Sequence, residues 1–475
     1  PDMTFEDLLL MRHEIVLTIV AIIILIAELA LDDKSRLKVI PLAIGLFALH
    51  TVIGFLPLRD GVLFGGMFQT TGTITLMKNV LNIGVLIVFI QSWTWIRHPD
   101  NHPKVSEYFL LTISTLIGMD FMISSGDFLM FYLGLELATI PLAALAAFER
   151  YKNRSAEAGI KLILSSALSS AVLLYGLSMI YGTTGSIYFN EISGLISANP
   201  LQVLAFIFFF SGMAFKISIV PFHLWAADVY EGAPVNITSY LSVISKGAAV
   251  FILMMVLYKV FPAITGMWQD VLWVTAVLTM TIGNLFALRQ KNLKRFLAFS
   301  SISQAGFIFL GIIGSSPLGM SSVIYFALVY IFSNLGAFGV VAAIANATGK
   351  ENMDDYNGLY RTNPKLSLVM MLALFSLAGI PPVAGFFGKF FLFTAAAEQG
   401  FYYLVLIALL NTIVSLYYYL LIIKAMFLTK SDDAIAYFKS DRPTRLGLIL
   451  CVAGIVVVGF YSPIYEMIKS LSFGI

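Results

Sequence analysis

The sequence predicts an all-α integral membrane protein with about fourteen transmembrane helices. Of its 475 residues, 59% are hydrophobic and only 12% are charged, whereas soluble proteins have about 25% charged residues. Apolar segments of about 20 residues, the length that crosses a bilayer, follow one another along the chain with short polar loops between them. This pattern excludes a soluble enzyme, and no basic stripe with interleaved aromatic residues supports nucleic-acid binding.

The spans are predicted in chain order from these apolar segments. The first six cover residues 13–31, 38–57, 74–96, 107–124, 127–148 and 158–181. The next four cover 201–227, 234–258, 270–288 and 295–314, and the last four cover 320–346, 366–396, 400–426 and 445–467. The seventh segment and the twelfth are long for a single span.

Lys and Arg are distributed asymmetrically over the predicted loops. The connections that follow odd-numbered spans hold most of them, among them Lys34, Arg150, Arg289, Lys350 and Arg442. Because cytoplasmic loops carry the excess of Lys and Arg, these connections are predicted to be cytoplasmic. Both termini are therefore expected on the opposite side, which is the periplasmic side in a bacterium.

Charged residues inside the predicted spans include Glu136, Lys78, Lys161, Lys216, Lys246 and Lys389. Each charge near a helix centre costs about 2.5 to 3.5 kcal/mol on insertion scales, so we expect these residues to have partners, water or a function. The alternatives are snorkelling to an interface and structural ion pairing. Snorkelling suits Lys78 best, because it lies near the start of its span. Asp120 is expected at the interface, because it lies near the outer end of its span.

Lys246, in the stretch SYLSVISKGAAVFILMM, lies at the middle of the eighth span, too deep to snorkel. Burial favours the neutral form of a lysine, and a nearby carboxylate favours the charged form. A lysine whose carboxylate partner moves nearer or farther is therefore a switchable proton site. We interpret Lys246 as the central residue for proton transfer.

Prolines interrupt the two long spans. Pro221 follows Lys216 in one, and Pro381 and Pro382 precede Lys389 in the other, in the stretch SLAGIPPVAGFFGKFFLF. Proline removes a backbone hydrogen bond, and interrupted helices at corresponding positions of two halves are typical of inverted-repeat transporters. The sequence therefore predicts discontinuous seventh and twelfth helices and two inverted five-helix repeats. The predicted divisions are an N-terminal three-helix region 1–106, the repeats 107–258 and 259–428, and a C-terminal loop and last helix 429–475.

Three candidate residues follow the first interruption. His223 has a side chain whose ordinary pKa of about 6.5 suits a proton relay, although a satisfied histidine at a helix bend explains it equally well. Asp228 and Glu231 lie in a predicted cytoplasmic connection without Lys or Arg. They are either an acidic entrance that concentrates protons or ordinary solvated carboxylates.

The sequence contains no motif for a cofactor or a metal. Cys451 is its single cysteine, so the chain cannot supply the thiolates of an iron–sulfur cluster or a disulfide framework. It has no G-x-x-x-x-G-K-[ST], G-x-G-x-x-G or C-x-x-C motif, and its five His residues lack the spacing of metal or haem ligands. No redox centre is therefore expected in this chain.

Several stretches resemble the antiporter-like membrane subunits of respiratory complex I. They are GLELATIPLAAL, GMAFKISIVPFHLWAADVYEGAP, LSVISKGAA, NLFALRQKNLKRFLAFSSISQAGFIFLG and LAGIPPVAGFFGKFFLF, and the similarity extends from about residue 70 over nearly all of the chain. Within this family, the DVYEGAP connection and Lys389 are similar to the branch called NADH-quinone oxidoreductase subunit N in bacteria, the counterpart of mitochondrial subunit 2. Its sister subunit M has a glutamate in place of Lys389, and subunit L has a long C-terminal extension that is not expected here.

The resemblance implies a fourteen-helix fold with a hydrated charged axis through the middle of the membrane. Glu136 corresponds to the fifth-helix glutamate of the family, which pairs with the seventh-helix lysine, here Lys216. Lys246 corresponds to the central eighth-helix lysine, and Lys389 corresponds to the twelfth-helix lysine that faces the exit side. Lys161 corresponds to an additional lysine on the sixth helix.

The resemblance further implies a proton-translocating membrane-arm subunit of NADH:quinone oxidoreductase in a bacterial inner membrane. The implied partners are subunit M and the small subunits J and K. No cofactor is implied in this chain, because NADH, FMN, iron–sulfur clusters and quinone are expected on other subunits. The alternatives are a subunit of a multisubunit sodium/proton antiporter or of a membrane hydrogenase, and an inert scaffold that only docks its neighbours.

Overall fold

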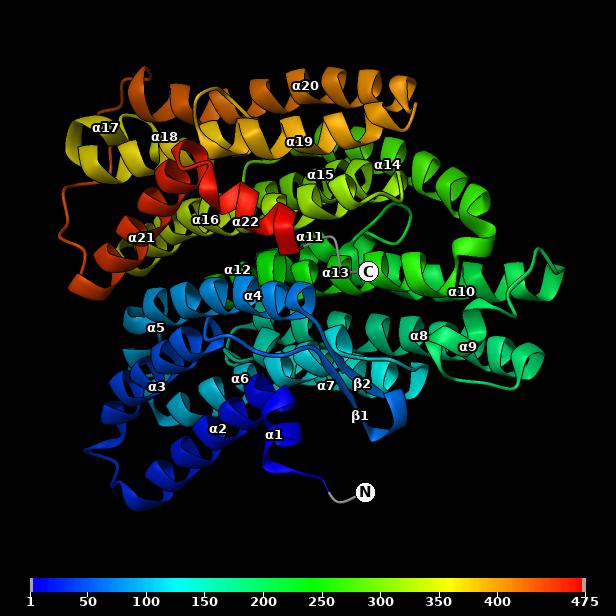
Figure 1. The fold of residues 1–475 in the computed structure, drawn as a ribbon. Coiled ribbons are helices and arrows are strands. Elements are labelled where there is room, and N and C mark those ends of the chain that lie inside the picture. The colour runs from blue at the N-terminus through cyan, green and yellow to red at the C-terminus, as the bar shows by residue number, and fades with distance from the viewer. Residues whose placement is uncertain (1–2, 472–475) are drawn as a thin grey trace.

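The computed structural model describes residues 3–471, and helices account for most of them (Figure 1). The helices lie roughly side by side, with the N-terminal helices at one edge of the bundle and α20 (Tyr402–Phe427) at the other. Thirteen helices in this part of the chain are long and apolar enough to cross a membrane. The prediction of an all-α chain rich in membrane spans is therefore confirmed. The outermost residues of the predicted divisions 1–106 and 429–475 lie outside the described residues.

The first helices are α1 (Phe5–Leu8), η1 (Leu9–Met11), α2 (Arg12–Ala30), η2 (Arg36–Lys38) and α3 (Val39–Gly54). A short antiparallel hairpin follows, in which β1 (Gly61–Leu63) pairs with β2 (Phe68–Thr70). Its turn, η3 (Phe64–Gly66), requires glycine, because Gly65 and Gly66 adopt φ angles of 66° and 105°, which side chains with a Cβ atom disfavour.

The next helices are α4 (Gly72–Gln91), α5 (Trp93–Arg97), η4 (His102–Lys104), α6 (Val105–Ile123), α7 (Phe128–Ala146), α8 (Asn153–Thr184) and α9 (Phe189–Ser193). Polar side chains cap two of them. Thr71 Oγ1 accepts from the Ile74 amide at 3.2 Å, and Asp127 Oδ1 accepts from the Met130 amide at 2.7 Å. Such caps satisfy backbone donors that a helix leaves free at its start, so α4 and α7 begin directly after these residues.

The middle of the chain forms α10 (Pro200–Ile217), α11 (Leu224–Gly232), α12 (Val235–Tyr240), η5 (Leu241–Ser245), α13 (Lys246–Val260), η6 (Pro262–Ile264) and α14 (Thr265–Ala287). Ser218 ends α10 in a left-handed conformation with φ 67°, and the next helix begins only at Leu224. Pro221 therefore lies in a non-helical link. η5 is a π-helical turn within the long span Val235–Val260.

The last part forms α15 (Leu293–Ile313), α16 (Pro317–Thr348), η7 (Met353–Tyr356), α17 (Leu359–Thr362), α18 (Pro364–Ala378), α19 (Ala384–Glu398), α20, α21 (Arg442–Phe460) and α22 (Pro463–Leu471). α18 has only 15 residues, and Gly379, with φ 79°, ends it just before Pro381 and Pro382. The predicted segment 366–396 is thus two short helices. For this reason, the described residues contain thirteen long apolar helices where about fourteen spans were predicted.

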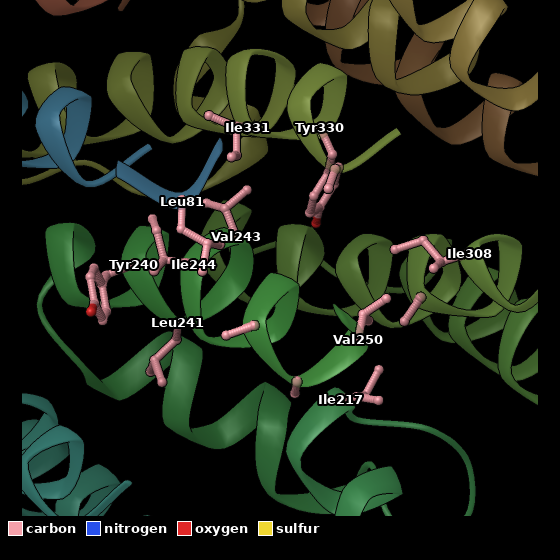
Figure 2. Packing of buried hydrophobic residues seen from close by; sticks show 14 of the residues in the cluster. Leu81, Ile217, Tyr240, Leu241, Val243, Ile244, Val250, Ile308, Tyr330 and Ile331 are labelled. Atoms are coloured by element: carbon pink, nitrogen blue, oxygen red, sulfur yellow. The ribbon is translucent and has the colours of Figure 1, made fainter. Parts of the chain in front are cut away.

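Helices α13, α15 and α16 form the buried centre of the bundle. α16 packs against α15, α18, α19 and α21. Figure 2 shows hydrophobic side chains from different helices packed together in this region: Leu81, Ile217, Tyr240, Leu241, Val243, Ile244, Val250, Ile308, Tyr330 and Ile331. Protein interiors are close-packed, so a charged side chain placed among these helices is shielded from lipid and from outside water.

Candidate functional site

The charged residues that the sequence predicted for the axis lie on four helices. Glu136 is on α7, Lys216 is on α10, Lys246 begins α13 and Lys389 is on α19. Lys246 and Lys389 are only 3% and 4% exposed, whereas Glu136 and Lys216 are partly buried. A charge in an apolar interior costs several kcal/mol unless it is paired. The partners of each side chain therefore decide what it can do.

Lys216 is held by a hydroxyl group, not by the carboxylate that the family resemblance assigns to it. Its Nζ donates to Thr139 Oγ1, which lies on the same helix as Glu136 and three residues later. Residues three apart on a helix share one side, so both side chains face α10. Glu136 Oε1 is buried without a hydrogen-bond partner among the described residues, and no Glu136–Lys216 ion pair within 4.0 Å forms there. The two charges are thus apart in this structure.

Lys246 follows directly on the π-helical turn η5, a feature that is frequent at functional sites. Its Nζ donates to the carbonyl oxygen of Ser301 at 3.1 Å and also to the hydroxyl group of Ser301. The ring of Tyr230 lies 6.0 Å from Nζ. The neighbours of Lys246 are thus neutral oxygens and an aromatic face, which attract a positive charge without neutralising it.

A run of polar side chains on α15 continues from Lys246. Ser300, Ser301, Ser303 and Gln304 are each at most 1% exposed. Ser300 hydrogen-bonds the hydroxyl group of Tyr419 on α20, and Gln304 Nε2 donates to the same hydroxyl at 3.2 Å. Sequence reasoning did not select these residues. The available signal was the stretch SSISQ within the apolar segment 295–314, where polar residues three and four apart share one side of a helix.

Lys389 lies at the other end of this polar run. Its Nζ has no hydrogen-bond partner among the described residues and lies 4.5 Å from the ring of Phe307 on α15, which is a cation–π distance. Phe307 is three residues after Gln304, so it follows the polar run by about one turn. Helix α15 therefore contacts both lysines: Ser301 contacts Lys246, and Phe307 contacts Lys389.

Lys161 does not join this axis in the structure. Its Nζ lies 2.5 Å from Glu157 and 2.8 Å from Asp228, and 40% of its side chain is exposed. Asp228 and Glu231 also contact Arg295 Nη1, at 2.7 and 3.1 Å. The two carboxylates are therefore neither an open acidic entrance nor freely solvated. Sequence reasoning missed their partner because Arg295 lies 67 residues after Asp228.

This network makes the stability of the fold depend on pH. Hydrogen bonds from Lys161 and then from Arg295 hold the pKa of Asp228 below its ordinary value. A carboxyl group with a lowered pKa stabilises the fold above its unfolded pKa of about 3.9, and this contribution is lost as pH falls through the folded pKa. We expect Asp228→Asn to lower the thermal-inactivation temperature of the purified complex at pH 7. The loss corresponds to about 1 kcal/mol or less, because Asp228 is partly exposed.

The difference between Asp228→Asn and the native complex is expected to start shrinking below about pH 4. It is expected to vanish only at a pH below the lowered pKa of folded Asp228, where the native carboxyl group is protonated as well. The matched control is Asp432→Asn, which removes an exposed loop carboxylate and should change nothing. A difference that stays constant down to the lowest pH would assign the effect to packing and contradict the electrostatic account.

His223 immediately precedes α11 and is partly exposed. Its Nδ1 atom is buried and has no hydrogen-bond partner among the described residues. The side chain lies in the non-helical link after α10, six residues after Ile217, where that helix ends. Its role as a proton relay stays a prediction.

Lys78 and Asp120 are both buried. Lys78 is 2% exposed, and its Nζ forms an ion pair with Glu14 Oε1 at 2.5 Å instead of snorkelling. Asp120 is 0% exposed, so the expectation of an interfacial side chain is wrong. The physical reason is that α6 packs against α2, α4 and α7, which cover the outer end of its span. Glu14 was missed because it lies at the very start of the first predicted span.

Within residues 3–471, no group of three or more His, Cys, Asp or Glu side chains is arranged to hold a metal ion. Cys451 is buried and free, and Gln91 Nε2 lies 3.7 Å from its Sγ. The assignment of cofactors to other subunits stays a prediction.

Residues 125–415 match the family described as NADH:quinone oxidoreductase/Mrp antiporter, TM. Relatives named NADH-quinone oxidoreductase subunit N match over nearly the full length. The protein of Phocaeicola vulgatus is 52% identical over 468 residues, which are 98% of this chain and 99% of the relative. The protein of Azobacteroides pseudotrichonymphae is 48% identical over 477 residues, which are 100% of this chain and 99% of the relative.

Solved structures agree with these relatives. A chain of respiratory complex I from Thermus thermophilus with bound aureothin has a TM-score of 0.81 and 26% identity, over 96% of this chain and 98% of that one. A chain of the Mrp complex from Dietzia sp. DQ12-45-1b has a TM-score of 0.85 at 20% identity, over 97% of each chain, which shows a shared fold. The resemblance found in the sequence is confirmed: this chain belongs to the family of NADH:quinone oxidoreductase and Mrp antiporter transmembrane subunits, and it matches the subunit N relatives over its whole length.

Proposed function

We propose that this chain is a proton-translocating membrane-arm subunit of an NADH:quinone oxidoreductase complex. The observation that carries the proposal is the placement of Lys246 and Lys389 along α15. These two buried lysines have no carboxylate partner among the described residues, and both contact α15: Lys246 at Ser301 and Lys389 at Phe307. The polar residues Ser303 and Gln304 lie between these two positions on α15. Buried lysines change their protonation state readily. The relatives named subunit N support the assignment to this complex.

The proposed switch is the distance between Glu136 and Lys216. At an effective dielectric constant of about 20, opening an ion pair from about 4 to about 8 Å weakens its attraction by roughly 2 kcal/mol. This is more than a tenfold change in the proton affinity of the lysine. Lys216 then releases or takes a proton through Lys246 toward Lys389. The open arrangement of Glu136 and Lys216, with Thr139 as the lysine's partner, supports this order of events.

We further propose that α10 with α11, and α18 with α19, are the halves of discontinuous seventh and twelfth helices. In each pair, a non-helical link that contains proline separates the helices, at residues 218–223 and 379–383. Non-helical backbone at membrane depth is tolerated where it adjoins protein or water. In this proposal, 107–258 and 259–428 are inverted five-helix repeats between the N-terminal region 1–106 and the C-terminal segment 429–475.

The rest of the proposed complex supplies the redox chemistry. NADH, FMN, iron–sulfur clusters and quinone bind to other subunits, and the neighbours of this chain in the membrane are subunit M and the small subunits J and K. The complex lies in the bacterial inner membrane. Both termini of this chain lie on the periplasmic side, as the placement of Lys and Arg in alternate connections indicates.

A sodium/proton antiporter subunit is the second candidate, because the fold matches the Mrp complex with a TM-score of 0.85. That likeness rests on 20% identity and extends to the fold alone. The relatives at 52% and 48% identity instead have the subunit N name over their full length. We therefore prefer the redox-driven complex.

Glu136→Gln tests the switch, because it removes the charge and keeps the size of the side chain. Without the carboxylate, the proton affinity of Lys216 no longer changes, so NADH-driven acidification of inverted membrane vesicles is expected to fall about tenfold with the complex intact. The matched control is Glu398→Gln, at the exposed end of α19. Native acidification by Glu136→Gln contradicts the switch. If an imposed sodium gradient drives proton movement without NADH, this chain is instead an antiporter subunit.

A further inference from the structure

A second group of buried polar side chains lies outside the proposed axis and before the family-matched region 125–415. It is built by four helices, α2, α3, α4 and α6, and each member is at most 5% exposed. We call this group the N-terminal polar cluster. Its members are His13, Glu14, His50, Lys78, Asn79, Asn82 and Asp120.

The cluster contains more carboxyl groups than ammonium groups. Lys78 Nζ lies 2.5 Å from Glu14 Oε1, and Glu14 Oε2 has no hydrogen-bond partner among the described residues. Asp120 is fully buried, and neither of its oxygen atoms has a partner in that part of the chain. α6, which carries Asp120, packs against α2, which carries Glu14, and against α4, which carries Lys78, so the charges of Lys78 and Glu14 act on Asp120. These three side chains therefore form one electrostatic unit.

This unit has a net negative charge if both carboxyl groups are ionised. An uncompensated charge in an apolar interior costs several kcal/mol. One bound proton neutralises this charge and takes up almost no volume. A metal cation would instead need several oxygen ligands around it. No group of three or more His, Cys, Asp or Glu side chains within residues 3–471 is arranged in that way. The unit therefore fits a proton better than a metal cation.

Hydrogen bonds lead from the cluster toward the N-terminal end of α2. His13, next to Glu14, places its Nε2 atom 2.9 Å from Asn79 Oδ1, and Asn79 Nδ2 donates to the carbonyl oxygen of Gly54 at 2.9 Å. Arg12 Nη2 donates to the same carbonyl oxygen at 3.0 Å. Arg12 is partly exposed, so this chain of contacts reaches the surface of the protein.

Other titratable groups face the cluster from the helices packed against it. His50 of α3 lies 5.8 Å from His13, ring to ring. Tyr240 of α12 and Asp120 act on each other electrostatically, and the hydroxyl group of Tyr240 lies 2.6 Å from Thr115 Oγ1. The hydroxyl group of Tyr240 also donates to the carbonyl oxygen of Thr112 on α6 at 3.5 Å. Among the described residues, no Lys, Arg or His lies within ion-pair distance, 4.0 Å, of Asp120.

We propose that the N-terminal polar cluster is a proton-binding site, in which Asp120 and Glu14 share one exchangeable proton in addition to the protons of Lys78. His13 and Asn79 connect this site with the surface near Arg12. The site is separate from the axis through Lys246. It opens toward the side of the membrane on which α2 begins, the expected periplasmic side.

The shared proton is tested by pH-difference infrared spectroscopy of the purified complex, which detects the carbonyl stretch of a protonated carboxylic acid. Asp120→Asn and Glu14→Gln each leave one carboxylate beside Lys78, a neutral pair that needs no additional proton. Each single variant is therefore expected to lose the same band, and the double variant is expected to lose no further band. Asp432→Asn, which removes an exposed carboxylate, is the matched control and should keep the band.

Retention of the band in both single variants overturns the proposal and leaves Glu14 and Lys78 as a structural ion pair. Loss in only one variant contradicts the sharing of the proton. A native band that responds to sodium, and does not respond in Asp120→Asn, overturns it in favour of a cation site. If Asp120→Asn does not assemble, Glu14→Gln provides the test. Lys246→Ala is expected to keep the band, so failure of the proposed axis is distinguishable from failure of this site.

Discussion

Lys246→Ala is expected to slow NADH-driven quinone reduction about tenfold or more in an intact complex. Lys246 is the only lysine that bonds Ser301 among the described residues, and it begins the polar route along α15. Without Lys246, no protein group binds the transferred proton's charge near the middle of the span. Placing an unbound charge at this depth costs about 2.5 to 3.5 kcal/mol on insertion scales. Since about 1.4 kcal/mol corresponds to a factor of ten in rate, the coupled reaction must slow. The rate of NADH oxidation in membranes measures the effect.

Lys246→Arg separates proton transfer from a purely structural positive charge. Arginine keeps the charge but does not release its proton in proteins, so we expect this variant to be impaired about as strongly as Lys246→Ala. Lys365→Ala, at the exposed start of α18, is the control for loss of a lysine elsewhere. Recovery of the native rate by Lys246→Arg would show that the charge alone suffices, and would contradict the proton-transfer role.

Gly385→Ala is expected to cause the largest loss of stability. A Cβ atom at residue 385 would lie 1.6 Å from the carbonyl oxygen of Ser376 on α18, and the Gly385 amide donates to Ser376 Oγ at 3.1 Å. The ends of α18 and α19 must therefore move apart, and overpacking of this kind costs about 3 kcal/mol. We expect the thermal-inactivation midpoint of the complex to fall by about 5 °C. Lys389, four residues later on α19, should be displaced as well, so pumping should also fall.

Gly182→Ala is the matched control for this substitution. Gly182 lies on α8, and a Cβ atom there would meet nothing within 4 Å. An alanine in its place should not lower the midpoint, because alanine has the higher helix propensity. Equal midpoints for Gly385→Ala and the native complex would contradict the close contact between α18 and α19.

The buried charges could be predicted from the sequence because the cost of placing a charge in an apolar span does not depend on the details of the fold. Lys246 and Lys389 were found in this way, and the structure places both in the interior. The prolines likewise predicted where helices stop, because proline cannot donate a backbone hydrogen bond. Pro221 and Pro381 both lie in non-helical links.

The partners of these charges could not be predicted, because they come from distant parts of the chain. Ser301 lies 55 residues after Lys246, and Thr139 lies 77 residues before Lys216. Both are common polar residues without a distinctive motif. The π-helical turn before Lys246 has no signal in the apolar stretch SYLSVIS. Asp120 was misplaced for the same reason, since its burial depends on helices that only the fold brings around it.

The most direct test of the proton axis is the number of protons moved per NADH oxidised in inverted membrane vesicles, with acidification and NADH oxidation recorded together. The native complex and Lys246→Ala are compared at matched rates of NADH oxidation, so that a slower enzyme is not mistaken for an uncoupled one. The account predicts that the remaining turnover of Lys246→Ala moves fewer protons per NADH or none. An unchanged ratio together with an unchanged rate of turnover would contradict the account and leave this chain as a scaffold.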